Sequence, residues 1–259
     1  MYYYVFEQPK TAADRKLQTK VREQLEDLGI VGELTAASPA RSAEELTDMG
    51  LRKGASTIIA VGSDRHINHV VSMVKTTERG LNRNVVVGTI PLDTGSALGE
   101  RLRLNNLYDA CEALKKRRYT TVDLGYVEGG GYFITSAEIH TATPVEITLR
   151  GDRWEVNNYI TDLIVFSDLT FSFYNNLASK TGLKKIASWL LGGEANAQNI
   201  SIFRARTLQV TGSVILPLTI EGEVVAKTPI ILYRMPKALK IIIKRDKFIS
   251  EQTDKKEQE

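Results

Sequence analysis

The sequence contains few of the side chains that bind transition metals or take part in redox reactions. Its 259 residues include one cysteine, Cys111, and three histidines. A single cysteine excludes an intrachain disulfide and a cysteine-rich metal site. His66 and His69 are three residues apart on an expected helix, but the sequence suggests no third ligand near them. A metal site built on this pair is therefore not expected.

Long apolar runs and a large charge of one sign are missing too. No segment approaches the ~18 to 20 consecutive apolar residues of a membrane-spanning helix, so we expect any membrane contact to be peripheral. The 34 basic and 31 acidic residues give a net charge of +3, which is too small to indicate a nucleic-acid-binding surface. The first residues lack the charged and apolar regions of a signal peptide, and we expect a cytoplasmic location.

Several common catalytic motifs are absent. The sequence has no Gly-x-Ser-x-Gly, no Gly-x-x-x-x-Gly-Lys-Ser/Thr and no Gly-x-Gly-x-x-Gly after an expected strand. These absences exclude the usual hydrolase elbow and the common fingerprints for binding ATP and dinucleotides.

The first half of the chain alternates short apolar segments with amphipathic ones. Strands are expected at residues 2–6, 30–36, 57–61 and 85–90, and helices lie between them, for example at 13–28 and 42–53. This alternation predicts an α/β domain over residues 1–121, with a doubly wound, mostly parallel sheet.

The pattern changes near Thr121. Short β-favouring segments with Gly-rich turns follow, at 122–127, 132–136, 145–150, 154–159 and 162–166 and again after residue 201. They predict a β-rich, mainly antiparallel domain over residues 122–244, whose last strand could return toward the first domain, and a polar tail at 245–259. A helix expected at 182–191 could pack on this sheet or rest on a membrane surface.

Two loops follow strands of the first domain. The loop that contains Gly62 joins a buried strand to a helix, and the second loop, 91–96, contains Gly95. Both are expected at the carboxyl ends of parallel strands, where they could face one crevice and bind a phosphate or carboxylate. The alternative is that the Gly62 loop only connects a strand to a helix.

The order of these features resembles the diacylglycerol kinase catalytic-domain family, the soluble lipid kinases that include sphingosine kinases. In that family the first loop reads Gly-Gly-Asp-Gly-Thr and the second begins Pro-Leu-Gly-Thr. This chain has Gly62-Ser63-Asp64-Arg65-His66 and Pro91-Leu92-Asp93-Thr94-Gly95-Ser96. Further landmarks are Val122-Asp123-Leu124-Gly125 and, where the family has Asp-Gly-Glu, Glu221-Gly222-Glu223.

The resemblance implies ATP and Mg²⁺ as cofactors, a lipid substrate, and an active site between the two domains. It assigns Asp64 to the catalytic and Mg²⁺ network and Glu223 to the acceptor hydroxyl. It implies that the nucleotide binds at Gly62, Ser63, Asp64, Arg65, Thr94, Gly95 and Ser96. The alternatives are that Asp64 caps a helix that opens at Ile67, and that Glu221 and Glu223 only flank a hairpin turn.

Several positions depart from the family pattern. Ser63 and Arg65 replace glycines, Asp93 replaces another glycine, and Ala97 replaces a carboxylate. Arg65 could fill the space of a phosphate or donate hydrogen bonds to it. The sequence therefore supports two hypotheses: an ATP-dependent kinase that transfers the γ-phosphate to a lipid hydroxyl, or a catalytically inactive family member that binds nucleotide or lipid or has a regulatory role.

Overall fold

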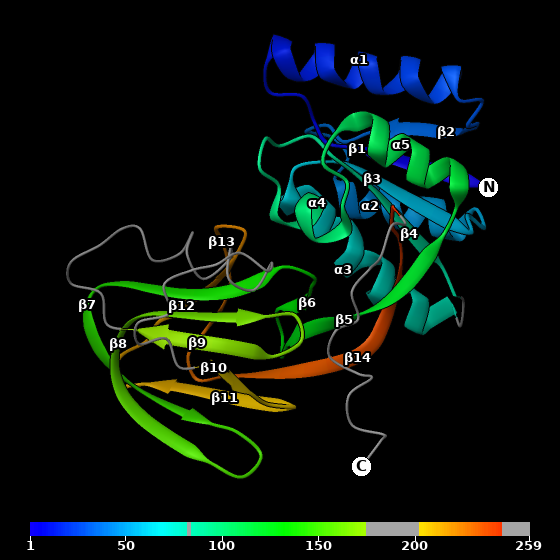
Figure 1. The fold of residues 1–259 in the computed structure, drawn as a ribbon. Helices are drawn as coiled ribbons and strands as arrows, with labels where there is room; N and C mark the ends of the chain where they lie inside the picture. Colours follow the sequence, from blue (N-terminus) through cyan, green and yellow to red (C-terminus); the bar gives the residue numbers. More distant parts are fainter. Residues whose placement is uncertain (82–83, 175–201, 245–259) are drawn as a thin grey trace, which may run out of the picture.

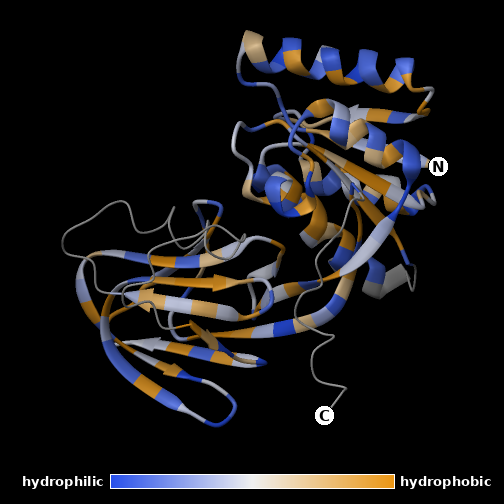
Figure 2. Cartoon of the chain, in the orientation of Figure 1, coloured by the Kyte–Doolittle hydropathy of each residue, from blue (hydrophilic) through white to orange (hydrophobic). Residues whose placement is uncertain are grey.

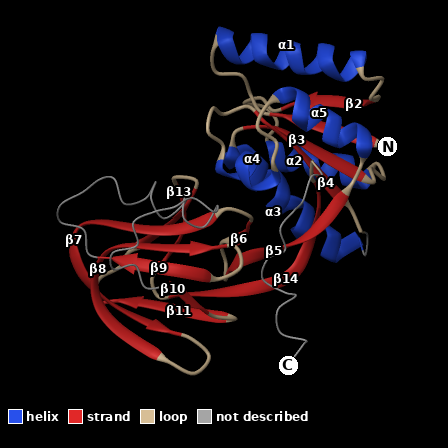
Figure 3. Ribbon diagram, in the orientation of Figure 1, coloured by secondary structure: helices blue, strands red, loops and turns tan. Residues whose placement is uncertain are grey.

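The computed structural model describes residues 1–81, 84–174 and 202–244, and it contains an α/β part joined to a strand-rich part (Figure 1). The described helices belong to the α/β part, as Figure 3 shows by colour. The helix expected at 182–191 and the polar tail at 245–259 lie outside the described residues.

Four parallel strands form the first part of the sheet, in the order β2-β1-β3-β4. Their bounds are β1 (Tyr2–Phe6), β2 (Gly32–Ala36), β3 (Thr57–Gly62) and β4 (Val86–Pro91). The expected parallel, doubly wound α/β domain is confirmed.

Helices alternate with these strands, as the sequence predicts. They are α1 (Ala12–Asp27), α2 (Ala43–Arg52), α3 (Asp64–Leu81), α4 (Ala97–Leu102) and α5 (Leu107–Lys116). Thr11 and Ser42 begin α1 and α2 with capping boxes, in which the side chain at the third helical position bonds back to the cap residue.

Helices cover both faces of the parallel strands. The Tyr2 hydroxyl donates to the Leu114 carbonyl of α5, whereas a Cβ atom on Gly50 of α2 would lie 2.5 Å from the Tyr3 ring. Successive residues of β1 therefore face different helical layers. This explains why β1 and β3 are nearly continuous runs of apolar and aromatic residues. β3 is coloured mainly orange in Figure 2.

The second part of the chain is mainly antiparallel sheet, as predicted. Its strands are β5 (Tyr119–Val127), β6 (Gly131–Phe133), β7 (Ser136–Arg150), β8 (Glu155–Phe166), β9 (Thr170–Tyr174), β10 (Ile202–Arg204), β11 (Thr207–Gly212), β12 (Pro217–Ile220), β13 (Glu223–Lys227) and β14 (Ile230–Ile242). A second core forms here, in which the rings of Trp154, Phe171 and Phe203 lie against one another.

Three strands are longer than the sequence pattern indicates. Only the part at 145–150 was expected of β7, apart from its first residue. β8 joins the segments expected at 154–159 and 162–166, and β14 joins the end of a strand expected at 224–233 to one expected at 239–243. The β7–β8 register shifts between His140 and Val145, and the β14–β5 register shifts between Met235 and Leu239. These bulges interrupt the apolar alternation without ending the strands, and the residues around them lie outside the expected segments.

β14 connects the two parts. It pairs antiparallel with β11 and β5, and at Lys240 and Ile241 it pairs in parallel with β4, so that one continuous sheet crosses the whole described structure. α3 adds further links, because Asn68 and Ser72 accept hydrogen bonds from the main chain of Ile134 and Tyr132. In the residues that the structure describes, no helix combines the length and apolarity needed to cross a membrane.

Candidate functional site

The two loops that follow β3 and β4 lie side by side. The Leu92 N–H donates to the Gly62 carbonyl at 2.9 Å. The Asp64 carboxylate accepts from the Ser96 hydroxyl at 2.5 Å and from the Leu98 N–H at 3.3 Å. Asp64 therefore joins the start of α3 to the start of α4.

Asp64 lies in the first turn of α3, so the alternative in which it caps a helix that opens at Ile67 is wrong. Its side chain is buried, and each of its two oxygens already accepts a hydrogen bond. Among the described residues, no group of three or more His, Cys, Asp or Glu side chains is arranged to hold a metal ion.

The residues before α3 contact a carboxylate of the chain itself. The Ser63 N–H donates to Oε2 of Glu7 at 2.7 Å. A Cβ atom on Gly62 would lie 2.7 Å from both Cβ and Oε2 of Glu7 and 2.9 Å from Cδ2 of His66. The space that Gly62 leaves is thus occupied by Glu7 and His66.

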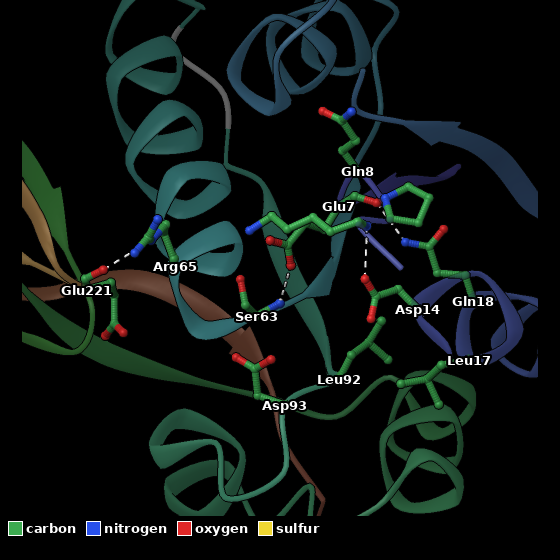
Figure 4. A pocket seen from close by; sticks show the side chains of 12 residues that line it. Glu7, Gln8, Asp14, Leu17, Gln18, Ser63, Arg65, Leu92, Asp93 and Glu221 are labelled. Carbon is green, nitrogen blue, oxygen red and sulfur yellow. Dashed lines mark hydrogen bonds between the residues drawn. The ribbon is translucent and has the colours of Figure 1, made fainter. Parts of the chain in front are cut away.

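Arg65 turns toward the strand-rich part (Figure 4). Its Nε donates to the Glu221 carbonyl at 3.0 Å, and its Nη1 lies 3.4 Å from Oε1 of Glu223. Because Arg65 lies within α3 and does not have a positive φ, its replacement of a family glycine causes no backbone strain.

Glu223 is held by two cationic side chains of α3. Besides Arg65, His69 contacts it, with Nε2 at 2.7 Å from Glu223 Oε2. His69 Nδ1 lies 2.7 Å from Oε1 of Glu44 at the start of α2. A neutral imidazole has only one N–H, so two carboxylates at these distances require the doubly protonated, charged ring.

The ionisation of these groups is consistent with this pairing. The hydrogen bond to Glu44, helped by Glu223, raises the pKa of His69 despite its partial burial. The hydrogen bond from His69 lowers the pKa of Glu44 to about 2. We call this arrangement of Glu44, His69 and Glu223 the His69 bridge.

Glu221 occupies the turn between β12 and β13. Glu221 and Gly222 both have positive φ, 49° and 78°, as a two-residue hairpin turn requires. Burial, reinforced by the charges of Asp64 and Glu138, raises the pKa of Glu221. The family resemblance assigns the acceptor hydroxyl to Glu223, but of the two turn carboxylates it is Glu221 that lines both cavities.

A first cavity of about 390 Å³, which we call the loop cavity, lies beside the Gly62 loop. Figure 4 shows its lining. Its charged residues are the carboxylates Glu7, Asp14, Asp93 and Glu221 and the cations Lys10 and Arg65. Partial burial and the nearby carboxylates of Asp64 and Glu7 raise the pKa of Asp93, although the Asp64 main chain acts in the opposite sense.

A second cavity of about 440 Å³ lies between α4 and the strand-rich part, and we call it the inter-domain cavity. Leu98, Ile164 and Phe166 form an apolar portion of its wall. Its charged lining residues are Asp64, Arg101, Glu138, Asp168 and Glu221. Arg101 Nη1 donates to the Ile134 carbonyl and the Ser167 hydroxyl, at 3.1 and 3.2 Å.

The residues singled out from the sequence are therefore only partly brought together. Ser63 and Arg65 line the loop cavity and Asp64 lines the inter-domain cavity. Of the other predicted residues, the ones that line neither cavity and do not contact Asp64 are Gly62, Thr94, Gly95 and Glu223. Ser96 is connected to the inter-domain cavity through the hydrogen bond that its hydroxyl donates to Asp64. Glu7, His69 and Arg101 were not singled out as site residues, because their partners are far away in the sequence.

Comparisons with known proteins agree with the motifs. Residues 4–127 match the family model of the diacylglycerol kinase catalytic domain. No curated protein matches the sequence. The fold is similar to the crystal structure of a diacylglycerol kinase from Bacillus anthracis strain Sterne, with a TM-score of 0.72, 13% identity, and coverage of 93% of this chain and 96% of that one.

A second structure from the same organism, of a protein assigned as a diacylglycerol kinase, gives a TM-score of 0.71 at 13% identity, with coverage of 93% and 95%. At these identities the likeness shows the fold. Together with the match of the family model, it shows that residues 4–127 are a domain of the diacylglycerol kinase catalytic-domain family, within a chain that has the lipid kinase-like fold.

Proposed function

We propose that this chain binds an amphipathic lipid in the inter-domain cavity and does not transfer phosphate to it. The lining of that cavity carries the proposal: apolar side chains form one portion, and Asp64, Arg101 and Glu221 provide polar groups. Such a cavity suits a molecule with a hydrocarbon chain and a polar head. Because a ligand of this kind resides in membranes, binding would bring the chain to a membrane surface.

The loop cavity supports the absence of transfer. Phosphoryl transfer depends on positioned phosphates, Mg²⁺ and neutralised charge. Here the Ser63 N–H already donates to Glu7, and both oxygens of Asp64 are hydrogen-bonded within the chain. The cavity lining has four carboxylates and only two cations. These residues do not fit the phosphates of ATP, so no phosphoryl-transfer step follows from this arrangement.

One observation favours a second function, ATP-dependent transfer of the γ-phosphate to a lipid hydroxyl. Asp64 and Glu221 line the same cavity, and the raised pKa of Glu221 suits a group that accepts a proton. For this function Glu221 takes the acceptor-side role first given to Glu223. The nucleotide and Mg²⁺ region stays at Gly62, Ser63, Asp64, Arg65, Thr94, Gly95 and Ser96.

The experiment combines binding with activity. A fluorescent short-chain diacylglycerol is titrated into the wild-type protein, into Ala97→Phe, which places a ring at the inter-domain cavity, and into Ala13→Phe, a matched control on the exposed face of α1. We expect binding by the wild type and the control, and affinity at least about tenfold lower for Ala97→Phe.

The same samples are then incubated with labelled Mg²⁺-ATP and vesicles that contain diacylglycerol. We expect no labelled lipid. Labelled lipid that disappears in Glu221→Gln would establish the second function instead, and the absence of diacylglycerol binding would refute the first.

A further inference from the structure

We propose that the carboxylate of Glu7 fills the anion-binding position of the Gly62 loop and thereby excludes phosphate from it. This inference rests on the proposed function in one respect, namely that the chain binds no nucleotide. It goes further by assigning the exclusion to one side chain.

The main chain holds Glu7 at this position. Glu7 follows β1 directly, its N–H donates to the Val61 carbonyl at 2.8 Å, and its carbonyl accepts from Nε2 of Gln18 at 2.6 Å. These two bonds attach it to β3 and α1. The side chain then extends over Gly62 to the Ser63 N–H.

The group that Glu7 contacts is one that a phosphate would use. Ser63 immediately precedes α3, a helix of 18 residues, and the free N–H groups at such a helix start attract anions. A carboxylate at this point satisfies the donor and supplies the negative charge. A phosphate could bind only by displacing it or by lying beside a like charge.

His66 makes the arrangement tighter. Its ring is buried, its Nε2 lies 2.8 Å from the Val5 carbonyl, and its Cδ2 would lie 2.9 Å from a Cβ atom on Gly62, close to the atoms of Glu7. Burial lowers the pKa of His66, which favours its neutral form, so the ring does not add a positive charge that could attract phosphate. The space over Gly62 is thus bounded by a neutral ring and an anionic side chain.

The inference is tested with inorganic tripolyphosphate, which presents the phosphates without a base or sugar. Its affinity is measured by titration calorimetry for the wild type, Glu7→Ala, Glu7→Gln and Glu26→Ala. Glu7→Ala frees the Ser63 N–H, whereas Glu7→Gln keeps the side-chain shape and removes the charge. Glu26, an exposed carboxylate near the end of α1, is the matched control.

We expect Kd for tripolyphosphate to be at least about tenfold lower in Glu7→Ala than in the wild type, which is the effect of one charge-assisted hydrogen bond. Glu7→Gln should fall between them, and Glu26→Ala should match the wild type. An unchanged Kd in Glu7→Ala, or an equal gain in Glu26→Ala, would overturn the inference. If Glu7→Ala fails to fold, the Kd of Glu7→Gln is compared with that of the wild type instead, and an unchanged value overturns the inference.

The outcome is separable from that of the proposed function. If the wild type binds no Mg²⁺-ATP and Glu7→Ala gains no tripolyphosphate affinity, only the role of Glu7 is refuted. If the wild type itself binds Mg²⁺-ATP but forms no labelled lipid, the role of Glu7 is refuted and the lipid-binding proposal stands; labelled lipid would refute both.

Discussion

The His69 bridge connects three elements, and its removal should have a measurable cost. Replacing His69 with Gln eliminates the cation between Glu44 of α2 and Glu223 of β13. Each contact is a charge-assisted hydrogen bond, worth about 1.5–3 kcal/mol where it is buried. Both carboxylate side chains are 41% exposed, so solvent screening reduces these values.

We therefore expect His69→Gln to lower the free energy of unfolding by about 2 kcal/mol in total, or the Tm by about 4–8 °C for a chain of this size. Urea unfolding and thermal melting measure the two quantities. A double-mutant cycle with Glu44→Gln should give a coupling energy of about 1 kcal/mol, because the two side chains touch.

The effect should depend on pH in a defined direction. The pKa of His69 is raised, so the stability it contributes is fully present below its ordinary pKa and is lost as the pH rises through the raised value. The pKa of Glu44 is lowered to about 2, so its contribution is present above its ordinary pKa and is lost as the pH falls through about 2.

The difference between the wild type and His69→Gln should consequently be largest near about pH 5.5 and much smaller near about pH 9. Equal stability of the two proteins at the lower pH would refute the charged bridge. The charged bridge would also be refuted if the stability difference were the same at both pH values, or if the coupling energy between His69 and Glu44 were zero.

Two further substitutions test the contacts around the loops. Gly62→Ala should lower the free energy of unfolding in urea by about 1–3 kcal/mol, because its Cβ would meet Glu7 and His66. Adding Glu7→Ala should recover part of this stability. An equal loss in the double variant would contradict the packing described. Asp64→Ala should lower the free energy of unfolding by about 1–3 kcal/mol, because the Ser96 hydroxyl and the Leu98 N–H lose their acceptor. Adding Ser96→Ala should lower it little further. Full additivity of the two changes would argue against the contact between the two side chains.

The α/β part could be predicted from the sequence because its signals are local. The apolar runs of β1 and β3 and the capping residues Thr11 and Ser42 act over a few neighbouring positions. Asp64 and Ser96 were found for a related reason, since both lie in loops that directly follow strands. The strand-rich part was predicted in type, but the lengths of its strands depend on bulges that disturb the alternation.

The remaining site residues depend on contacts between distant positions. Glu7 and Ser63 are 56 residues apart, and His69 and Glu223 are 154 residues apart. No local pattern connects such pairs. Which of Glu221 and Glu223 lines the cavities is likewise set by distant contacts. Arg65 and His69 of α3 bind the Glu223 side chain, and this pairing depends on how the β12–β13 turn packs against α3.

The pairing of β14 with β4 has a consequence for the order in which the chain can fold during synthesis. The outer edge of β4 gains its neighbour only when residues 240 and 241 are made, more than a hundred residues after β4 itself. Until then, the nascent α/β part exposes unpaired N–H and C=O groups along a hydrophobic strand, which is a template for association with other chains. β14 therefore protects the exposed edge of β4 in the α/β part. Ribosome-bound chains that end before β14 should need protection by a chaperone.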